Sequence, residues 1–345
     1  MDEEFDFDAY EKALKDDPMY PVDDCIALIE NVMEDSIIRL YMSIDNFLFQ
    51  DIHLDRVISN MPKWVCDEGI SPEGGCTKDF YEHLKAKAKH PIFGRFIYYY
   101  DLWSLIAAVQ DRLEAAIMFM REFYKIVPCK IVHKQEEYTA GSRCGGREET
   151  QAHVLLNSVF VAFASVFDLM AKIAREQFLF SSYDFEKYKE MKSNGALFSY
   201  TMKNISDTLK ASDMIFSAPL VVRKIVTFRN EYVHNGPWDL RSSVYNTAID
   251  GEPADVIIYA PDMDDYGNFV KSGSRNKFYS QNNAINAQLP SLIKEATELL
   301  KNTIDELSRL YQADTNVKED PERTEDCLKG IREFYDTLKH NGHKE

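Results

Sequence analysis

Apolar residues recur at helical spacing along most of the chain, at every third or fourth position of long stretches. The pattern predicts amphipathic helices over residues 24–50, 78–90, 98–126, 287–311 and 320–340. From Thr150 to Phe178 the sequence is almost continuously apolar, which predicts a helix buried on most of its sides. Residues 185–210 predict one or two short helices.

Two stretches interrupt this helical pattern. Residues 128–149 have no sustained apolar period and are rich in glycine, so they predict a domain boundary or a mobile loop. Between 243 and 280, the apolar runs Val256–Tyr259 and Phe269–Val270 flank an acidic turn, which predicts an inserted β-hairpin. The predicted fold is therefore all-α with a small β-hairpin insertion. Its expected parts are an N-terminal helical region (1–140), a helical bundle (150–314) that contains the insertion, and a C-terminal helix or tail (315–345).

Another predicted helix, over residues 218–234, has clear boundary signals. Ser217 is a candidate N-cap, and Pro219 suits the first turn. At the other end, Asn235-Gly236-Pro237 offers a residue for a left-handed cap, followed by a proline that cannot continue the helix.

Charge is distributed unevenly along the chain. Its 57 acidic and 40 basic residues give a formal net charge of −17, but residues 1–24 carry −8 and residues 314–345 carry −3. The body, residues 25–313, therefore carries −6 and is only mildly acidic. This balance argues against a broad surface that coats nucleic acid, because such surfaces depend on clustered Lys and Arg. It leaves room for a compact site with local positive charge.

Composition and targeting signals favour a cytoplasmic protein. The six cysteines are scattered without a CxxC pair, which argues against a disulfide framework and against a zinc site. The acidic start MDEEFDFD is unlike a signal peptide. Polar residues interrupt the one candidate membrane segment, Val154 to Met170, so no membrane partner is expected.

The segment at the end of the 218–234 helix carries the strongest functional signal. Arg229 is followed directly by Asn230 and, five residues after Arg229, by His234. This arrangement, placed near the end of a helix in a predicted bundle, resembles the signature of the HEPN superfamily, an arginine, a polar residue and then a histidine. The resemblance covers less than half of the chain.

The resemblance implies a HEPN-like helical bundle and an endoribonuclease that needs no metal or other cofactor. It also implies a homodimer in which two copies of the motif form one site, RNA as the substrate, and a role as a toxin or in defence against phage. A toxin of this kind would be controlled by an antitoxin or another regulatory protein.

The motif residues suit RNA cleavage by their own chemistry. A histidine exchanges its proton near neutral pH, and the negative end of the helix dipole favours the protonated form of His234. The planar guanidinium of Arg229 suits a pair of phosphate oxygens, and Asn230 can orient the side chain of Arg229, of His234 or of both. Asn230 and His234 share a helix face, whereas Arg229 and His234 lie about 140° apart on a straight helix. Either Arg229 curls around the helix end at Asn235-Gly236, or a second copy supplies the missing face.

Further residues are expected to support this site. Tyr232 and Asn235 belong to the motif itself, and Asp168 lies on a polar stripe of the apolar helix that either faces the site or faces solvent. Arg229 has an alternative use as a structural tie to a core acid such as Asp168. A basic stretch could guide RNA or form a solvated face; it contains Lys85, Lys87, Lys89 and Arg95. A second group has aromatic neighbours that suit stacking on bases: Lys271, Arg275 and Lys277 beside Phe278 and Tyr279.

Two other functions fit the same sequence. One is a non-catalytic HEPN-like module that binds RNA, a nucleotide or a protein partner. The other is a helical scaffold in which the motif arose by chance.

Overall fold

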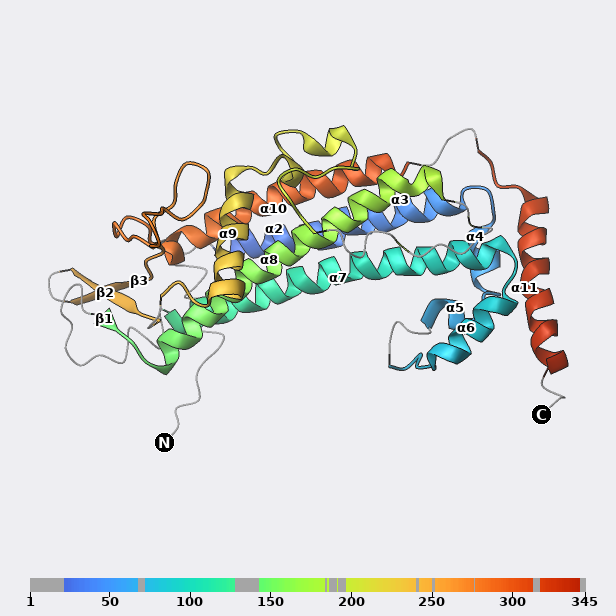
Figure 1. Cartoon of the computed structure of the whole chain (residues 1–345), viewed down its shortest axis with the longest axis horizontal. Coiled ribbons are helices and arrows are strands. Elements are labelled where there is room, and N and C mark those ends of the chain that lie inside the picture. Colours follow the sequence, from blue (N-terminus) through green and yellow to red (C-terminus); the bar gives the residue numbers. More distant parts are fainter. Residues whose placement is uncertain are drawn as a thin grey trace. The chain divides into compact units, whose positions relative to one another are not determined.

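The computed structural model describes residues 22–67, 72–127, 143–183, 185, 191, 197–239, 242–249, 252–275, 277–312 and 317–341. These residues are mostly helical, with one small antiparallel sheet, which confirms the predicted all-α class with a β insertion (Figure 1). The acidic N-terminus up to Pro21 and most of the predicted loop at 128–149 lie outside the described residues.

The chain divides into two compact units, each assembled from three separate stretches. The first unit takes residues 1–35, 110–167 and 209–303, and the second takes 36–109, 168–208 and 304–345. This division differs from the predicted boundary between residues 140 and 150. Three long helices contribute residues to both units: α7 (Pro91–Lys125), α8 (Arg147–Leu179) and α10 (Ile285–Leu310). Their apolar periodicity continues through the unit boundaries, so the sequence pattern shows no break there.

The remaining elements fall mostly within one unit. The first unit holds α2 (Val22–Asn31), α9 (Leu220–Asn235) and the strands β1 (Arg143–Cys144), β2 (Val244–Ile249) and β3 (Glu252–Ile257). The second holds α3 (Ile38–Phe49), α4 (Leu54–Ile58), α5 (Lys63–Asp67), α6 (Lys78–Lys87) and α11 (Pro321–Asn341). A π-helical stretch, Val32–Ile37, joins α2 to α3, so the predicted helix over 24–50 is continuous but not uniform.

Part of the range 185–210, where short helices are predicted, lies outside the described residues. Its described part contains one 3₁₀ turn, Asp207–Lys210, and two others, Phe180–Ser182 and Ile215–Ser217, lie on either side of the range. Within the described part of 185–210, no α-helix forms. This segment has several glycine, serine and asparagine residues, which favour turns over helix.

The insertion contains a β-hairpin, but it is formed by β2 and β3, and only Val256 and Ile257 of the predicted strands belong to it. β2 and β3 pair antiparallel with Tyr245 opposite Ile257, and β1 extends the sheet beside β2. The predicted pair 256–259 and 269–270 is therefore wrong as the main hairpin. The acidic turn between them closes on itself, because the Asp264 carboxylate accepts the backbone N–H groups of Tyr266 and Asn268, each at 2.9 Å.

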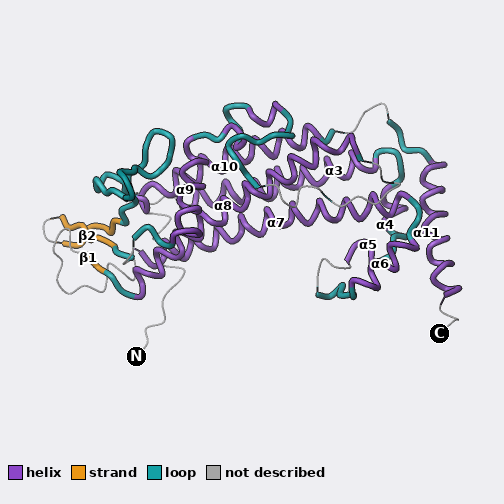
Figure 2. Tube along the Cα trace, in the orientation of Figure 1, coloured by secondary structure: helices purple, strands orange, loops and turns teal. Residues whose placement is uncertain are grey.

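One buried asparagine attaches the insertion to α10. The Asn286 side chain, which is 1% exposed, accepts the N–H of Ile258 at 2.9 Å and donates to the carbonyl of Val256 at 2.7 Å. Its backbone carbonyl accepts the hydroxyl of Tyr124 at 2.6 Å. A buried amide that both accepts and donates a hydrogen bond fixes the end of β3 against the first turn of α10. Figure 2 shows the strands and the following loops lying together beside the start of α10.

The ends of α9 follow the sequence signals in part. Pro219 takes the N-cap position, whereas the Ser217 hydroxyl donates to the carbonyl of Met214 at 2.8 Å, so the predicted Ser217 cap is wrong. At the other end, Gly236 has φ of +87°, a conformation that favours glycine, and α9 ends there as predicted.

An aromatic cluster packs α9 against α8 within the first unit. The rings of Phe160 and Phe228 stack with centroids 4.5 Å apart, and Trp238 lies 5.1 Å from Phe228. All three side chains are at most 1% exposed. The residue directly before Arg229 is thus fixed in the core, which positions the motif on a rigid helix.

The apolar helix α8 confirms the prediction of extensive burial. By length and composition alone, the helical stretch Arg147–Ser182 is long and apolar enough to cross a membrane. Within its most apolar window, 61% is buried inside the protein. Core burial thus accounts for much of its apolar character.

In the second unit, Asp51 joins α11 to α7. Its carboxylate lies 2.8 Å from Arg95 and 2.8 Å from Arg323. Burial raises the pKa of Asp51, but the two guanidinium groups outweigh burial and hold this pKa below its ordinary value of 3.8. The lowered pKa means that Asp51 stabilises the fold above about pH 4, and that this contribution is lost as the pH falls through the folded-state pKa.

We expect Asp51→Asn to lower the free energy of unfolding by about 2 kcal/mol at neutral pH, because two charge-assisted hydrogen bonds are lost. Urea unfolding of both proteins across a pH series measures this difference, which should shrink below about pH 4. Asp336→Asn, at an exposed position, is the control and should change little. A difference that stays constant at low pH would contradict the ion-pair account.

Candidate functional site

The last turns of α9 bring the predicted catalytic residues to the surface. Asn230 and His234 are exposed, and Arg229 is half-buried. Nη1 of Arg229 donates to Oδ1 of Asn230 at 2.8 Å. The bond joins the guanidinium to the residue that shares a helix face with His234.

This hydrogen bond bears on the two ways by which Arg229 and His234 were expected to meet. Because α9 continues through Asn235, the chain does not turn between Arg229 and His234. A straight helix separates the two Cβ directions by about 140°. The bond to Asn230 draws the long arginine side chain toward the shared face of Asn230 and His234. The three residues therefore form one surface on a single helix, here called the motif face.

A buried carboxylate anchors the same helical turns. Glu231 is 6% exposed, and its Oε2 accepts the Nδ2 group of Asn235 at 2.8 Å. Its Oε1 lies 2.9 Å from Nζ of Lys277, which comes from the segment that leads into α10. A buried acid needs such a partner, because an unpaired charge in the interior is costly. The ion pair fixes the end of α9 against residues 277–283.

The predicted supporting residues have different places. Asn235 donates a hydrogen bond to the buried carboxylate of Glu231, and Tyr232 is half-buried on α9. Asp168 belongs to the second unit, where its Oδ1 accepts the backbone N–H of Phe198 at 2.9 Å. The motif face lies on α9, and the ion pair of Glu231 with Lys277 joins this helix to the segment before α10.

The predicted RNA-guiding stretch lies in the second unit, and part of it is already paired. Arg95 lies 2.8 Å from Asp51, and Lys85 lies 3.6 Å from Glu82. Lys87, at the end of α6, is half-buried, and Lys89 is exposed. Pairing with carboxylates reduces the positive charge that this stretch offers to phosphate groups.

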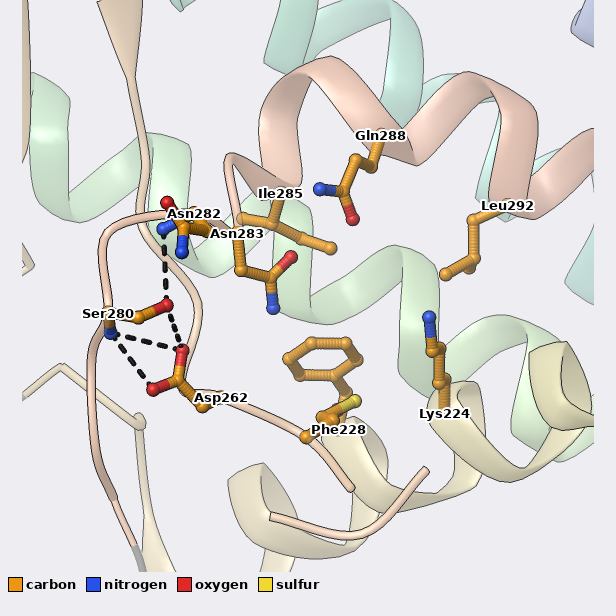
Figure 3. A pocket seen from close by; sticks show the side chains of 10 residues that line it. Lys224, Phe228, Asp262, Ser280, Asn282, Asn283, Ile285, Gln288 and Leu292 are labelled. Carbon is orange, nitrogen blue, oxygen red and sulfur yellow. Dashed lines mark hydrogen bonds between the residues drawn. The ribbon is translucent and has the colours of Figure 1, made fainter. Parts of the chain in front are cut away.

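A polar pocket of about 340 Å³ opens between α9 and α10. Figure 3 shows the side chains of Lys224, Asn283 and Gln288 directed toward the space around the Phe228 ring. On its far side the Asp262 carboxylate is held by the Ser280 hydroxyl at 2.8 Å and by the Ser280 backbone N–H. This pocket thus offers three amides, one carboxylate and one ammonium group beside an aromatic ring.

A second hollow, the aromatic pocket, encloses about 430 Å³ just beyond the end of α9. Its lining residues are Trp238, Asp239, Tyr245, Tyr259, Lys277, Tyr279 and Gln281. The rings of Tyr245 and Tyr259 lie 5.1 Å apart, and the hydroxyl of Tyr279 donates to the carbonyl of Trp238 at 2.9 Å. Burial, with the negative charge of Asp239 nearby, raises the pKa of Tyr279, so its phenol stays protonated at neutral pH.

One short segment separates the two pockets. Along residues 277–283, Lys277, Tyr279 and Gln281 line the aromatic pocket, while Ser280, Asn282 and Asn283 line the polar pocket.

Sequence reasoning found part of this site. It marked Lys277 and Tyr279 as a basic and aromatic group, but it did not connect them to the motif. Glu231 lies inside the motif sequence. Its importance comes from burial of its side chain and from its ion pair with Lys277, and neither is visible in the sequence. Trp238, Tyr245 and Tyr259 are scattered along the sequence, and pairing of β2 with β3 is what brings the two tyrosines together.

Metal ligands do not gather anywhere in the described residues: no group of three or more His, Cys, Asp or Glu side chains is arranged to hold an ion. Comparison of the chain with protein-family models, with curated proteins and with solved structures gives no match.

Proposed function

We propose that the protein is an endoribonuclease of HEPN type that cleaves RNA without a metal ion. The observation that carries the proposal is the Arg229–Asn230 hydrogen bond on a helix face that also presents His234 to solvent. An oriented guanidinium and an accessible imidazole are the two groups that such a cleavage needs.

The proposed reaction uses the RNA's own 2′-hydroxyl as the nucleophile. The 2′ oxygen forms a bond to the adjacent phosphorus, and the bond from phosphorus to the 5′ oxygen breaks. The proton of the 2′-hydroxyl is removed as the bond forms, and a proton is delivered to the departing 5′ oxygen; His234 serves this transfer. Arg229 stabilises the negative charge that grows on the phosphate oxygens, and Asn230 holds the guanidinium in place. The products end in a 2′,3′-cyclic phosphate and a 5′-hydroxyl.

The surroundings of the motif face support an RNA substrate. The polar and aromatic pockets contribute Lys224, amide groups and tyrosine rings, which can bind ribose, phosphate and bases. We further propose that two copies of the chain share one site in a homodimer, that the fold is HEPN-like, and that the cytoplasmic protein acts as a toxin or antiviral effector under control of a regulatory partner.

An end-group assay tests the proposed chemistry. Unstructured RNA is incubated with the purified protein in EDTA, and the fragments are then labelled with polynucleotide kinase. We expect direct labelling, because a 5′-hydroxyl accepts phosphate without prior dephosphorylation. Fragments that carry a 5′-phosphate would contradict the mechanism. RNA that is bound but stays intact would favour the alternative of a non-catalytic binding module.

A further inference from the structure

We propose that the polar pocket holds one phosphate and its ribose from the RNA backbone, away from the cleaved bond, with Lys224 paired to the phosphate. This inference rests on the proposed function for the identity of the strand. It gives a role to Lys224, Asn283 and Gln288, none of which belongs to the motif. It also makes a strand, rather than a single nucleotide, the preferred ligand.

The floor of the polar pocket is apolar and fixed in place. Phe228, Ile285 and Leu292 line it, and each of them is at most 8% exposed. Phe228 stacks on Phe160 at 4.5 Å, and the backbone N–H of Ile285 donates to the carbonyl of Ile258 at 2.9 Å. A pocket that is already formed saves the free energy of ordering its walls when a ligand binds. Its volume of about 340 Å³ accommodates a phosphate together with a ribose.

Lys224 supplies the contact to phosphate. Its side chain is half-buried on α9 and forms no ion pair with another of the described residues. Two acids lie nearby and keep their charge. Asp262 lies across the Phe228 ring from Lys224 and is held by Ser280, and the exposed Glu295 lines a smaller adjoining hollow (Figure 3). The pocket as a whole is therefore not strongly positive, and the phosphate binds by direct contact at its Lys224 end.

The amides beside Lys224 suit the hydroxyl groups of ribose. The Nδ2 group of Asn283 donates to the carbonyl of Pro261 at 3.2 Å, which orients this amide and leaves its oxygen as an acceptor. Gln288 is exposed, and its amide extends toward the same space (Figure 3). A hydroxyl both donates and accepts, so it matches an amide oxygen and an amide nitrogen. Contacts to the 2′-hydroxyl are how proteins distinguish RNA from DNA at a given position.

Burial of the aromatic ring argues against a base as the occupant. A base binds by stacking on an accessible ring face. Phe228 is only 1% exposed, so its ring offers no such face. The base of the bound nucleotide therefore points out of the pocket, and the contribution of Lys224 to binding should not depend on which base it is.

The pocket and the motif lie on one continuous helix, α9, which fixes their separation. Lys224 precedes His234 by ten residues, which corresponds to about 15 Å along the helix axis and about 80° around it. A single nucleotide is too short to contact both residues. A strand whose cleaved phosphate lies at Arg229 and His234 reaches Lys224 with a phosphate farther along its backbone.

Fluorescence anisotropy with a labelled uridine octamer tests the proposal. The measurements use His234→Ala protein in EDTA, so that the RNA stays intact, over a series of salt concentrations. We expect Lys224→Gln to weaken binding about tenfold at low salt, because one charge-assisted contact is lost. The slope of log K against log salt should fall by about 0.7, the value for one phosphate contact on a single strand. Lys224→Arg, which keeps the charge, should bind like the parent.

Two further comparisons test the base and the ribose. A cytidine octamer should lose the same factor in Lys224→Gln as the uridine octamer does. Gln288→Ala should weaken binding of the uridine octamer more than binding of its 2′-deoxy counterpart, because only the RNA has the hydroxyl. A loss in Lys224→Gln that is confined to one of the two bases, or equal losses for RNA and DNA in Gln288→Ala, would contradict a backbone site.

A matched lysine separates a specific contact from a general effect of charge. Lys294 is exposed on α10 and lines neither the polar pocket nor the aromatic pocket, so Lys294→Gln should bind the octamer like the parent with the same salt slope. An unchanged slope in Lys224→Gln, or an equal loss in Lys294→Gln, would overturn the proposal. So would uridine monophosphate that binds as tightly as the octamer, because the pocket would then be a site for free nucleotides.

Failure of this proposal is distinguishable from failure of the proposed function. If the wild-type protein cleaves RNA but Lys224→Gln binds the octamer normally, the pocket assignment alone is wrong. If Lys224→Gln behaves as expected but the wild-type protein leaves RNA intact, the catalytic proposal alone is wrong.

Discussion

Replacing His234 with alanine is expected to lower the rate of RNA cleavage by about 10²–10⁴-fold, because a positioned group that transfers protons contributes acceleration of this size. Arg229→Ala should lower the rate by about 10²–10³-fold through the loss of charge stabilisation at the phosphate. His234 is exposed and makes no hydrogen bond among the described residues, so its removal should leave the fold intact. Rates are measured with a fluorescent RNA in EDTA.

Two exposed residues of the same types provide matched controls. His83→Ala on α6 and Arg112→Ala on α7 remove an exposed imidazole and an exposed guanidinium from helices that do not carry the motif. Both controls should cleave RNA like the wild type. If His234→Ala retains full activity while its thermal unfolding matches the wild type, His234 has no catalytic role.

A mixing experiment extends this prediction to the proposed homodimer. In a mixture of Arg229→Ala and His234→Ala proteins, a mixed dimer has one copy with an intact His234 and another with an intact Arg229. If two copies share a site, the mixture should recover activity that neither variant has alone. A mixture as inactive as its components would show that each site lies within one chain.

The second large effect is expected on stability. Phe160→Ala should lower the free energy of unfolding by about 3–5 kcal/mol, because it removes a fully buried ring that stacks on Phe228 at 4.5 Å. Phe228 precedes Arg229, so the cavity would also loosen the helix that carries the motif. Urea unfolding followed by circular dichroism measures the change.

A position on the same helix provides the control for packing. Val154 on α8 is 45% exposed, and Val154→Ala should change the free energy of unfolding by less than about 0.5 kcal/mol. Similar unfolding midpoints for Phe160→Ala and Val154→Ala would contradict the assignment of the Phe160–Phe228 stack to the core.

The helices were predictable because their signals are local. Apolar spacing located α7, α8, α10 and α11 to within several residues, and the Gly236 signal marked the end of α9. The same periodicity hid the division into two units, since a helix that contributes to both shows one uninterrupted pattern. For the hairpin, the run Val256–Tyr259 indicated the wrong pair, because β3 begins before this run, at Glu252, and pairs with the preceding strand β2.

The motif was predictable, but its setting was not. Arg229, Asn230 and His234 stand close together in the sequence, so their spacing alone places them on neighbouring turns of one helix. The ion pair of Glu231 with Lys277 joins residues from distant segments, and burial of the glutamate determines its importance. Likewise, the aromatic pocket gathers tyrosines from β2, from the chain after β3 and from the segment before α10. Such long-range placement depends on tertiary packing, for which a single sequence has no local signal.

The central claim is that the 2′-hydroxyl of the RNA performs the cleavage at the motif face. The most direct measurement uses an RNA with one main cleavage site and a matched RNA in which the nucleotide on the 5′ side of that site lacks its 2′-hydroxyl. We expect the wild-type protein, in EDTA, to cut the first RNA and to leave that linkage of the second RNA intact. Cleavage of the substituted linkage at a similar rate would contradict the account, because another nucleophile would then carry out the reaction.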